Sequence, residues 1–93
     1  MSIRPATPQD IPFILDMIQE LADYEKESDA VENTPEMLNE TLFGDNPKAF
    51  AEIIEEDKPV GIAIWFLNYS TWTGKHGIYL EDLYVKPEAR GKG

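Results

Sequence analysis

The spacing of apolar residues changes once along the chain and divides it into a helical part and a stranded part. Apolar side chains recur every three or four positions over residues 11–24 and again over 35–42, which is the period of an amphipathic helix. A short extended segment, Ser2–Pro5, comes before the first helix. Three strand-like runs follow the second helix, at 49–55, 60–69 and 78–85. The predicted order of elements is β-α-α-β-β-β.

Both helices begin with the same local signal. Thr7 and Thr34 are capping residues, and each is followed by a proline, which suits the first helical position. Gly44 ends the second helix. Short loops join the last three strands, so these strands should pair antiparallel. No repeat interrupts the pattern, and we expect a single α/β domain over residues 1–93.

Composition excludes several classes of protein. The chain has no cysteine and one histidine, which leaves no disulfide framework and no metal constellation. The 18 acidic residues outnumber the 8 basic ones, and a net charge of −10 argues against a nucleic-acid partner. No apolar run approaches membrane-spanning length, and no signal peptide is evident. We therefore expect a cytoplasmic protein that binds neither nucleic acid nor a membrane.

The charges are unevenly distributed along the chain. Residues 16–40 carry nine acidic side chains and one basic residue, Lys26. Residues 75–93 carry four of the eight basic residues. This arrangement suits a protein that holds a cationic molecule and a polyanionic one, although a solvated helix face with ordinary strand-end lysines gives the same pattern.

The chain ends in a glycine-rich basic segment, Arg90-Gly91-Lys92-Gly93, directly after a strand. Glycines let a phosphate approach the backbone N–H groups, and Arg90 and Lys92 supply positive charge. A dinucleotide-binding fold would have its glycines after the first strand, and the GxxxxGK[ST] phosphate loop is missing. We expect this segment to be part of a different kind of phosphate site, cut before the helix that completes it.

The order of elements, the opening Ile3–Thr7 and the ending Leu83–Gly93 resemble the GCN5-related N-acetyltransferase (GNAT) superfamily. Within it, Tyr24-Glu25, Trp72–Lys75 and Tyr79–Val85 resemble the diamine acetyltransferases, of the spermidine/spermine or thialysine type. The resemblance implies the N-terminal half of an acyl-CoA N-acyltransferase fold, with a mixed, mostly antiparallel sheet. The chain would be truncated within the pyrophosphate-binding turn, and the family's general-acid tyrosine would lie in the other half.

The implied reaction moves acetyl from acetyl-CoA to a primary amine, which attacks only after it has lost a proton. Glu81 is the candidate base, acting through water, and also an amine-binding residue. It interrupts an apolar strand, and partial burial would raise the pKa of its carboxyl group. A structural carboxylate paired with a cation is the alternative. Neighbours on a regular strand point to opposite faces, so Asp82 is not expected to be a second catalytic carboxylate.

The resemblance also assigns the other site residues. The main chain of Leu83, Tyr84 and Val85 would bind the pantetheine arm beside a bulge in the strand, and Arg90, Gly91, Lys92 and Gly93 would bind the pyrophosphate. Tyr24 and Glu25 would contact the amine. Trp72 could stack on an alkylammonium group, or it could be an apolar plug beneath its loop. Glu25 alone is equally well explained as an exposed helix-end acid. No metal is expected.

Two departures leave the substrate open among a diamine, a polyamine and a lysine-like amino acid. Ser70 and Thr71 are neutral where the polyamine enzymes carry an acid, and the stretch from Trp72 to Glu81 is one residue longer. The alternative function is a non-catalytic, acyltransferase-like binding module. Because the strand 78–85 would sit in mid-sheet, we expect this chain to form a homodimer or to pair with a complementary chain, which light scattering would detect.

Overall fold

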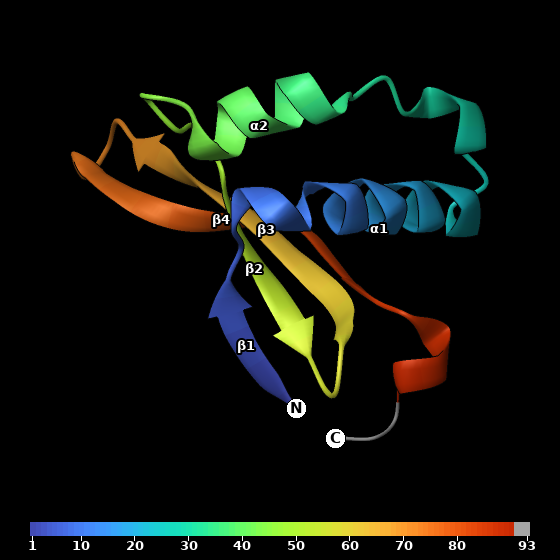
Figure 1. Ribbon diagram of the computed structural model, residues 1–93. Helices are drawn as coiled ribbons and strands as arrows, with labels where there is room; N and C mark the ends of the chain where they lie inside the picture. Colours follow the sequence, from blue (N-terminus) through green and yellow to red (C-terminus); the bar gives the residue numbers. More distant parts are fainter. Residues whose placement is uncertain (91–93) are drawn as a thin grey trace.

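The computed structural model describes residues 1–90 as a four-stranded sheet with two helices on one face (Figure 1). The helices are α1 (Ile11–Tyr24) and α2 (Pro35–Phe43). The strands are β1 (Ser2–Pro5), β2 (Phe50–Glu55), β3 (Pro59–Ser70) and β4 (Lys75–Val85). Single 3-10 turns lie at Pro8–Asp10, Ser28–Ala30 and Pro87–Ala89. The predicted element order and α/β class are confirmed.

The sheet has the order β1-β2-β3-β4, and every neighbouring pair is antiparallel. A parallel strand, which the expected mixed sheet requires, is not among the described residues. The strand β4 begins at Lys75, three residues earlier than the sequence pattern indicated, because Ser70 pairs with Lys75 across a tight turn. Gly74 occupies the left-handed region in that turn, with φ of 71°, where a side chain would be strained.

The core lies between the helices and the sheet. Its four most deeply buried side chains come from α1, β2 and β3: Ile14, Met17, Ile53 and Ile62. The helix α2 adds Leu38 and Leu42 to the same cluster, and β4 adds Tyr84. Both helices therefore cover one face of the sheet, as the ribbon view also shows (Figure 1). Among residues 1–90, neither helix has the length and apolar composition needed to cross a bilayer.

The opposite face of the sheet is only partly covered. Near the end of β4, Ile54, Val60 and Ala89 form a small second cluster with Val85 against them. Farther along β3 and β4, the described residues leave large apolar side chains exposed: Leu67, Ile78, Leu80 and Leu83.

One partly buried ion pair fixes the start of α1 to the edge of the sheet. The Asp10 carboxylate accepts hydrogen bonds from the two terminal nitrogens of Arg4, at 2.8 and 2.9 Å, and from the Thr7 backbone N–H at 2.7 Å. Arg4 also contacts Glu55 on β2, with 2.9 Å between Nε and Oε1. The Arg4 hydrogen bonds, followed by those from Thr7, oppose the effect of burial and lower the pKa of Asp10 to about 2.

The substitution Asp10→Asn should lower the free energy of unfolding at pH 7 by about 1–2 kcal/mol, because it removes a charge-assisted pair. The folded pKa lies below the ordinary value of about 3.9, so this stabilisation is complete above about pH 5 and is lost as the pH falls from about 4 to 2. Denaturant titrations at pH 7, 4 and 2.5 measure the effect. Asp16→Asn, an exposed change in α1, is the control, and equal losses in both variants would contradict the assignment.

Candidate active site

The site is organised around one extra residue in β4. Asp82 pairs with Ile64 of β3, but the next β3 residue, Trp65, pairs with Leu80, so Glu81 has no partner across the ladder. This is a β-bulge, which disrupts the ladder locally and bends the strand. The bulge that the family resemblance implied in this strand is therefore present.

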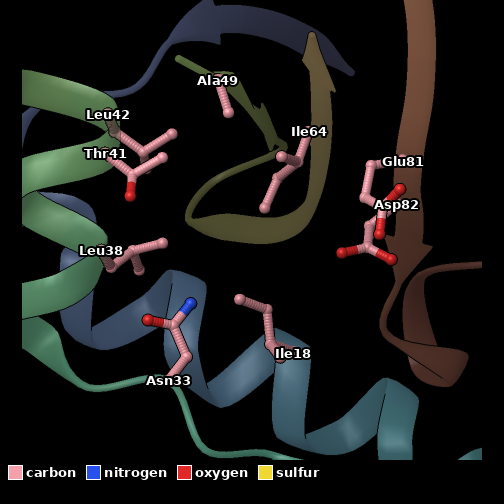
Figure 2. Close-up of a pocket in the computed structure, with 9 residues that line it drawn as sticks. All are labelled: Ile18, Asn33, Leu38, Thr41, Leu42, Ala49, Ile64, Glu81 and Asp82. Atoms are coloured by element: carbon pink, nitrogen blue, oxygen red, sulfur yellow. The ribbon is translucent and has the colours of Figure 1, made fainter. Parts of the chain in front are cut away.

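The bulge faces a cavity of about 250 Å³ between the helices and β4 (Figure 2). Five apolar side chains form most of its wall: Ile18, Leu38, Leu42, Ala49 and Ile64. Glu81 and Asp82 supply its acidic part. Asn33, from the loop between the helices, and Thr41, from α2, supply its neutral polar part. The cavity can hold a small molecule that has one cationic end.

The expectation that Glu81 and Asp82 point to opposite faces is wrong. Figure 2 shows both carboxyl groups directed toward the same cavity, which both residues line. Strict alternation applies to a regular ladder, and the unpaired Glu81 shifts the following residues relative to it. The structure therefore places two carboxyl groups where the sequence predicted one.

The carboxyl group with a raised pKa is that of Asp82. Burial is the largest cause, followed by repulsion from Glu81 and from Glu25. Glu81, which we expected to be the partly buried acid, is exposed at the rim of the cavity that it lines. The negative charges of Glu25 and Glu81 thus both repel the Asp82 carboxylate. An ammonium group bound beside Asp82 would lower this repulsion.

Tyr24 and Glu25 lie at the C-terminal end of α1, and both are exposed. Arg90, a candidate residue for binding the cofactor, lies against the Tyr24 ring. The Arg90 guanidinium carbon lies 5.6 Å from the centroid of the Tyr24 ring and 5.2 Å from that of Tyr84, and Arg90 Nε donates to the Val85 carbonyl at 2.7 Å. The amine-side and cofactor-side candidates are therefore neighbours.

A second contact ties the end of β4 to α1. The Tyr84 hydroxyl donates to Glu20 Oε1 at 3.1 Å, and Lys86 Nζ lies 3.4 Å from Glu20 Oε2. Burial, and then the hydrogen bond to Glu20, raise the pKa of Tyr84. Glu20 was not predicted as a site residue, because in the sequence it is one of nine acidic residues over 16–40. It fixes the segment whose main chain is the cofactor candidate.

The remaining cofactor candidates are only partly described. Leu83 is exposed, and Val85 is half-buried. Within the described sheet, β4 pairs with β3 along one of its edges. The candidates Gly91, Lys92 and Gly93 lie outside the described residues. Among residues 1–90, no group of three or more His, Asp or Glu side chains could hold a metal.

Trp72 is not an apolar plug beneath its loop. It is 96% exposed, at the tip of the hairpin between β3 and β4. The strand from Ile64 at the cavity to Ser70 at the hairpin spans roughly 20 Å, at about 3.4 Å per residue. In the described chain, Trp72 therefore does not lie near Glu81 and Asp82.

The comparisons agree on one family. Residues 14–93 match the Acetyltransferase (GNAT) family. The chain is 46% identical to a thialysine N-epsilon-acetyltransferase from Sus scrofa, over 98% of this chain and 58% of that protein. It is 42% identical to human spermidine/spermine N(1)-acetyltransferase-like protein 1, over 98% of this chain and 14% of that protein. A solved structure of a possible acetyltransferase from Clostridium difficile 630 superposes with a TM-score of 0.72 and 26% identity, over 99% of this chain and 61% of that one.

The strands β3 and β4 approach each other closely at Gly61, and a substitution there tests the packing of β4 beside the site. A Cβ added at Gly61 would lie 2.5 Å from the Tyr84 carbonyl oxygen, so Gly61→Ala must displace the β4 backbone. We expect a loss of roughly 1–3 kcal/mol in unfolding free energy, measured by denaturant titration. In the control Gly77→Ala, the added Cβ meets the end of the Asn68 side chain at 3.0 Å, which can move. An equal or larger loss in the control would contradict the packing described.

Proposed function

Since the chain belongs to the acetyltransferase (GNAT) family, we propose that it transfers acetyl from acetyl-CoA to a primary amine of a small cationic substrate. The chain spans 58% of the length of the Sus scrofa relative. The activity is therefore proposed for a protein of the relatives' length that carries these 93 residues, called the extended protein below. A cytoplasmic location and association into a homodimer or with a complementary chain stay predictions.

The observation that supports this proposal most is the pair of carboxyl groups at the bulge. Glu81 and Asp82 line one cavity, and Glu25 adds to the negative potential that raises the pKa of Asp82. An ammonium ion bound between these acids gains their attraction and lowers their mutual repulsion. The apolar wall beside them accommodates the methylene groups of an alkylamine. The cavity thus suits an amine rather than an anionic acceptor.

Glu81 is the proposed base. The bound ammonium must lose a proton before its nitrogen can attack the thioester carbonyl carbon. Glu81 is exposed at the cavity rim, so a water molecule can carry the proton from the nitrogen to its carboxylate. As the new C–N bond forms, the C–S bond breaks and the CoA sulfur leaves with the electron pair, and the second proton of the nitrogen passes to that thiolate. Asp82, which is half-buried, holds the cation in place.

The end of β4 is the proposed cofactor side. Outward main-chain groups of Leu83, Tyr84 and Val85 would bind the pantetheine arm, and N–H groups there can stabilise the developing oxyanion. Arg90, with Gly91, Lys92 and Gly93, would bind the pyrophosphate. The Arg90 guanidinium is held only by two tyrosine rings and one carbonyl in the described chain. A phosphate forms a stronger, charge-assisted contact with a guanidinium. Arg90 can therefore give up its contacts with the rings and the carbonyl and bind a phosphate.

The exchange Glu81→Gln in the extended protein should lower acetyl transfer near neutral pH by roughly 10²–10⁴-fold, the usual contribution of a general base. The loss should shrink at alkaline pH, where the amine loses its proton unaided. A rate profile from pH 6 to 10 measures both effects. Glu56→Gln, an exposed change in the β2–β3 turn, is the control. A wild-type rate and profile in Glu81→Gln would remove this residue from catalysis.

The exchange Arg90→Ala should weaken acetyl-CoA binding roughly 10- to 100-fold and amine binding much less, because a charged phosphate contact is lost. Isothermal titration with each ligand separates the two effects, and Lys58→Ala, a charge removed from the β2–β3 turn, is the control. An equal loss for both ligands, or a loss for the amine alone, would refute the assignment. Acetyl-CoA binding without transfer to any amine would favour the non-catalytic binding module.

A further inference from the structure

The C-terminal part of α1 contacts the segment that follows the bulge through two side chains. Glu20 and Tyr24 are four positions apart, so they lie on the same side of the helix. Glu20 accepts the hydrogen bond from the Tyr84 hydroxyl at 3.1 Å, and the Tyr24 ring centroid lies 5.6 Å from the Arg90 guanidinium carbon. One side of α1 therefore faces both the end of β4 and the arginine proposed to bind the pyrophosphate.

Tyr84 is held from the strand side and from the helix side. Its main chain pairs with Ile62 of β3, and two residues later the Lys86 N–H donates to the Val60 carbonyl at 2.8 Å. Tyr84 is only 5% exposed, and a buried hydroxyl without a partner is costly, so the acceptor that Glu20 provides favours one direction of the ring. Burial, followed by this hydrogen bond, raises the pKa of Tyr84, and the hydroxyl therefore keeps its proton and donates at neutral pH.

The direction of the Tyr84 ring decides where the Arg90 side chain lies. The guanidinium carbon is 5.2 Å from the ring centroid, within the distance of about 6 Å at which a ring face attracts a cation. A guanidinium over a ring face still has the N–H groups of its edge to donate to a ligand. A side chain that is already held in place loses less conformational freedom when it binds. Glu20 thus acts on Arg90 through the tyrosine ring between them.

Glu20 is not suited to bind the cofactor itself. A carboxylate repels a pyrophosphate, and Lys86 Nζ, which lies 3.4 Å from Glu20 Oε2, offsets part of that repulsion. Within residues 1–90, neither Glu20 nor Tyr84 lines the cavity that holds Glu81 and Asp82. An effect of Glu20 through its charge would make cofactor binding tighter when the charge is removed, whereas an effect through Tyr84 would make it weaker. The two roles therefore predict changes of opposite sign.

From these contacts we propose that Glu20 is a positioning residue for the cofactor. Acting through the Tyr84 hydroxyl, it keeps the Arg90 guanidinium beside the end of β4, from where the guanidinium reaches the pyrophosphate. The inference rests on the proposed function, in which Arg90 binds that pyrophosphate. It requires that acetyl-CoA affinity depends on Glu20 and that amine affinity does not.

The test is a double-mutant cycle in the extended protein, with acetyl-CoA affinity measured by isothermal titration. Glu20→Leu and Tyr84→Phe should each weaken binding roughly five-fold, as expected when one hydrogen bond no longer contributes. The double variant should lose no more than Glu20→Leu alone, because the two residues act as one pair. Tyr84→Phe keeps the ring and its packing, so it stays informative if Glu20→Leu fails to fold.

Two further variants separate positioning from a general loss. Glu20→Gln should bind acetyl-CoA nearly as tightly as the wild type, because its amide oxygen still accepts from the Tyr84 hydroxyl. Asp16→Asn, which removes an exposed acid one turn earlier on α1, is the matched control and should leave the affinity unchanged. In steady-state kinetics, Glu20→Leu should raise the KM for acetyl-CoA and leave kcat and the KM for the amine unchanged, since only cofactor binding is altered.

Three results would overturn the inference while the proposed function stands: unchanged or tighter acetyl-CoA binding in Glu20→Leu, additive losses in the double variant, or a loss in Glu20→Gln as large as in Glu20→Leu. Arg90→Ala in the same series tests the premise. Wild-type acetyl-CoA affinity in that variant would remove the proposed phosphate contact and the inference with it. Acetyl-CoA binding that changes as expected, without transfer to any amine, would support the inference and refute the proposed transfer.

Discussion

One unpaired residue in β4 sets the geometry of the whole candidate site. With Glu81 outside the ladder, Asp82 pairs with Ile64 and points toward the helices, while Glu81 lies at the rim of the same cavity. A regular strand would separate the two carboxyl groups onto opposite faces. The bulge also bends the strand just before the segment proposed to bind the cofactor. In the proposed mechanism, amine and cofactor thus meet at a single irregularity in the backbone.

The helix α1 holds this irregular strand in position. Its inward side chains, Ile14 and Met17, are fully buried, and its Glu20 accepts the Tyr84 hydroxyl at the end of β4. Its last residue, Tyr24, lies against the Arg90 guanidinium together with Tyr84. The same helix therefore supports the core, the segment proposed to bind the cofactor and the side proposed to bind the amine. A displacement of α1 would alter all three, and the Arg4–Asp10 pair at its start opposes such a displacement.

The sequence predicted the element order and most boundaries, because the helical period in 11–24 and the runs in β2 and β3 are strong local signals. It could not predict the consequences of the bulge. In β4, consecutive apolar residues stand on both sides of Glu81 and Asp82, so no alternation of apolar and polar positions reveals which residue leaves the ladder. Asp82 was not expected to act beside Glu81, because neighbouring residues on a regular strand point to opposite faces. Contacts between distant segments, such as Glu20 with Tyr84, likewise depend on packing that no local pattern encodes.

The central claim is that the bulge creates a negatively charged binding site for an ammonium ion at Asp82. NMR titration of the Asp82 carboxyl carbon, in the free protein and with saturating amine, tests this most directly. The account predicts a pKa above the ordinary aspartate value in the free protein, as burial and the neighbouring acids require, and a fall in that pKa when the amine binds. An Asp82 pKa that is ordinary in the free protein, or that does not move with bound amine, would contradict it.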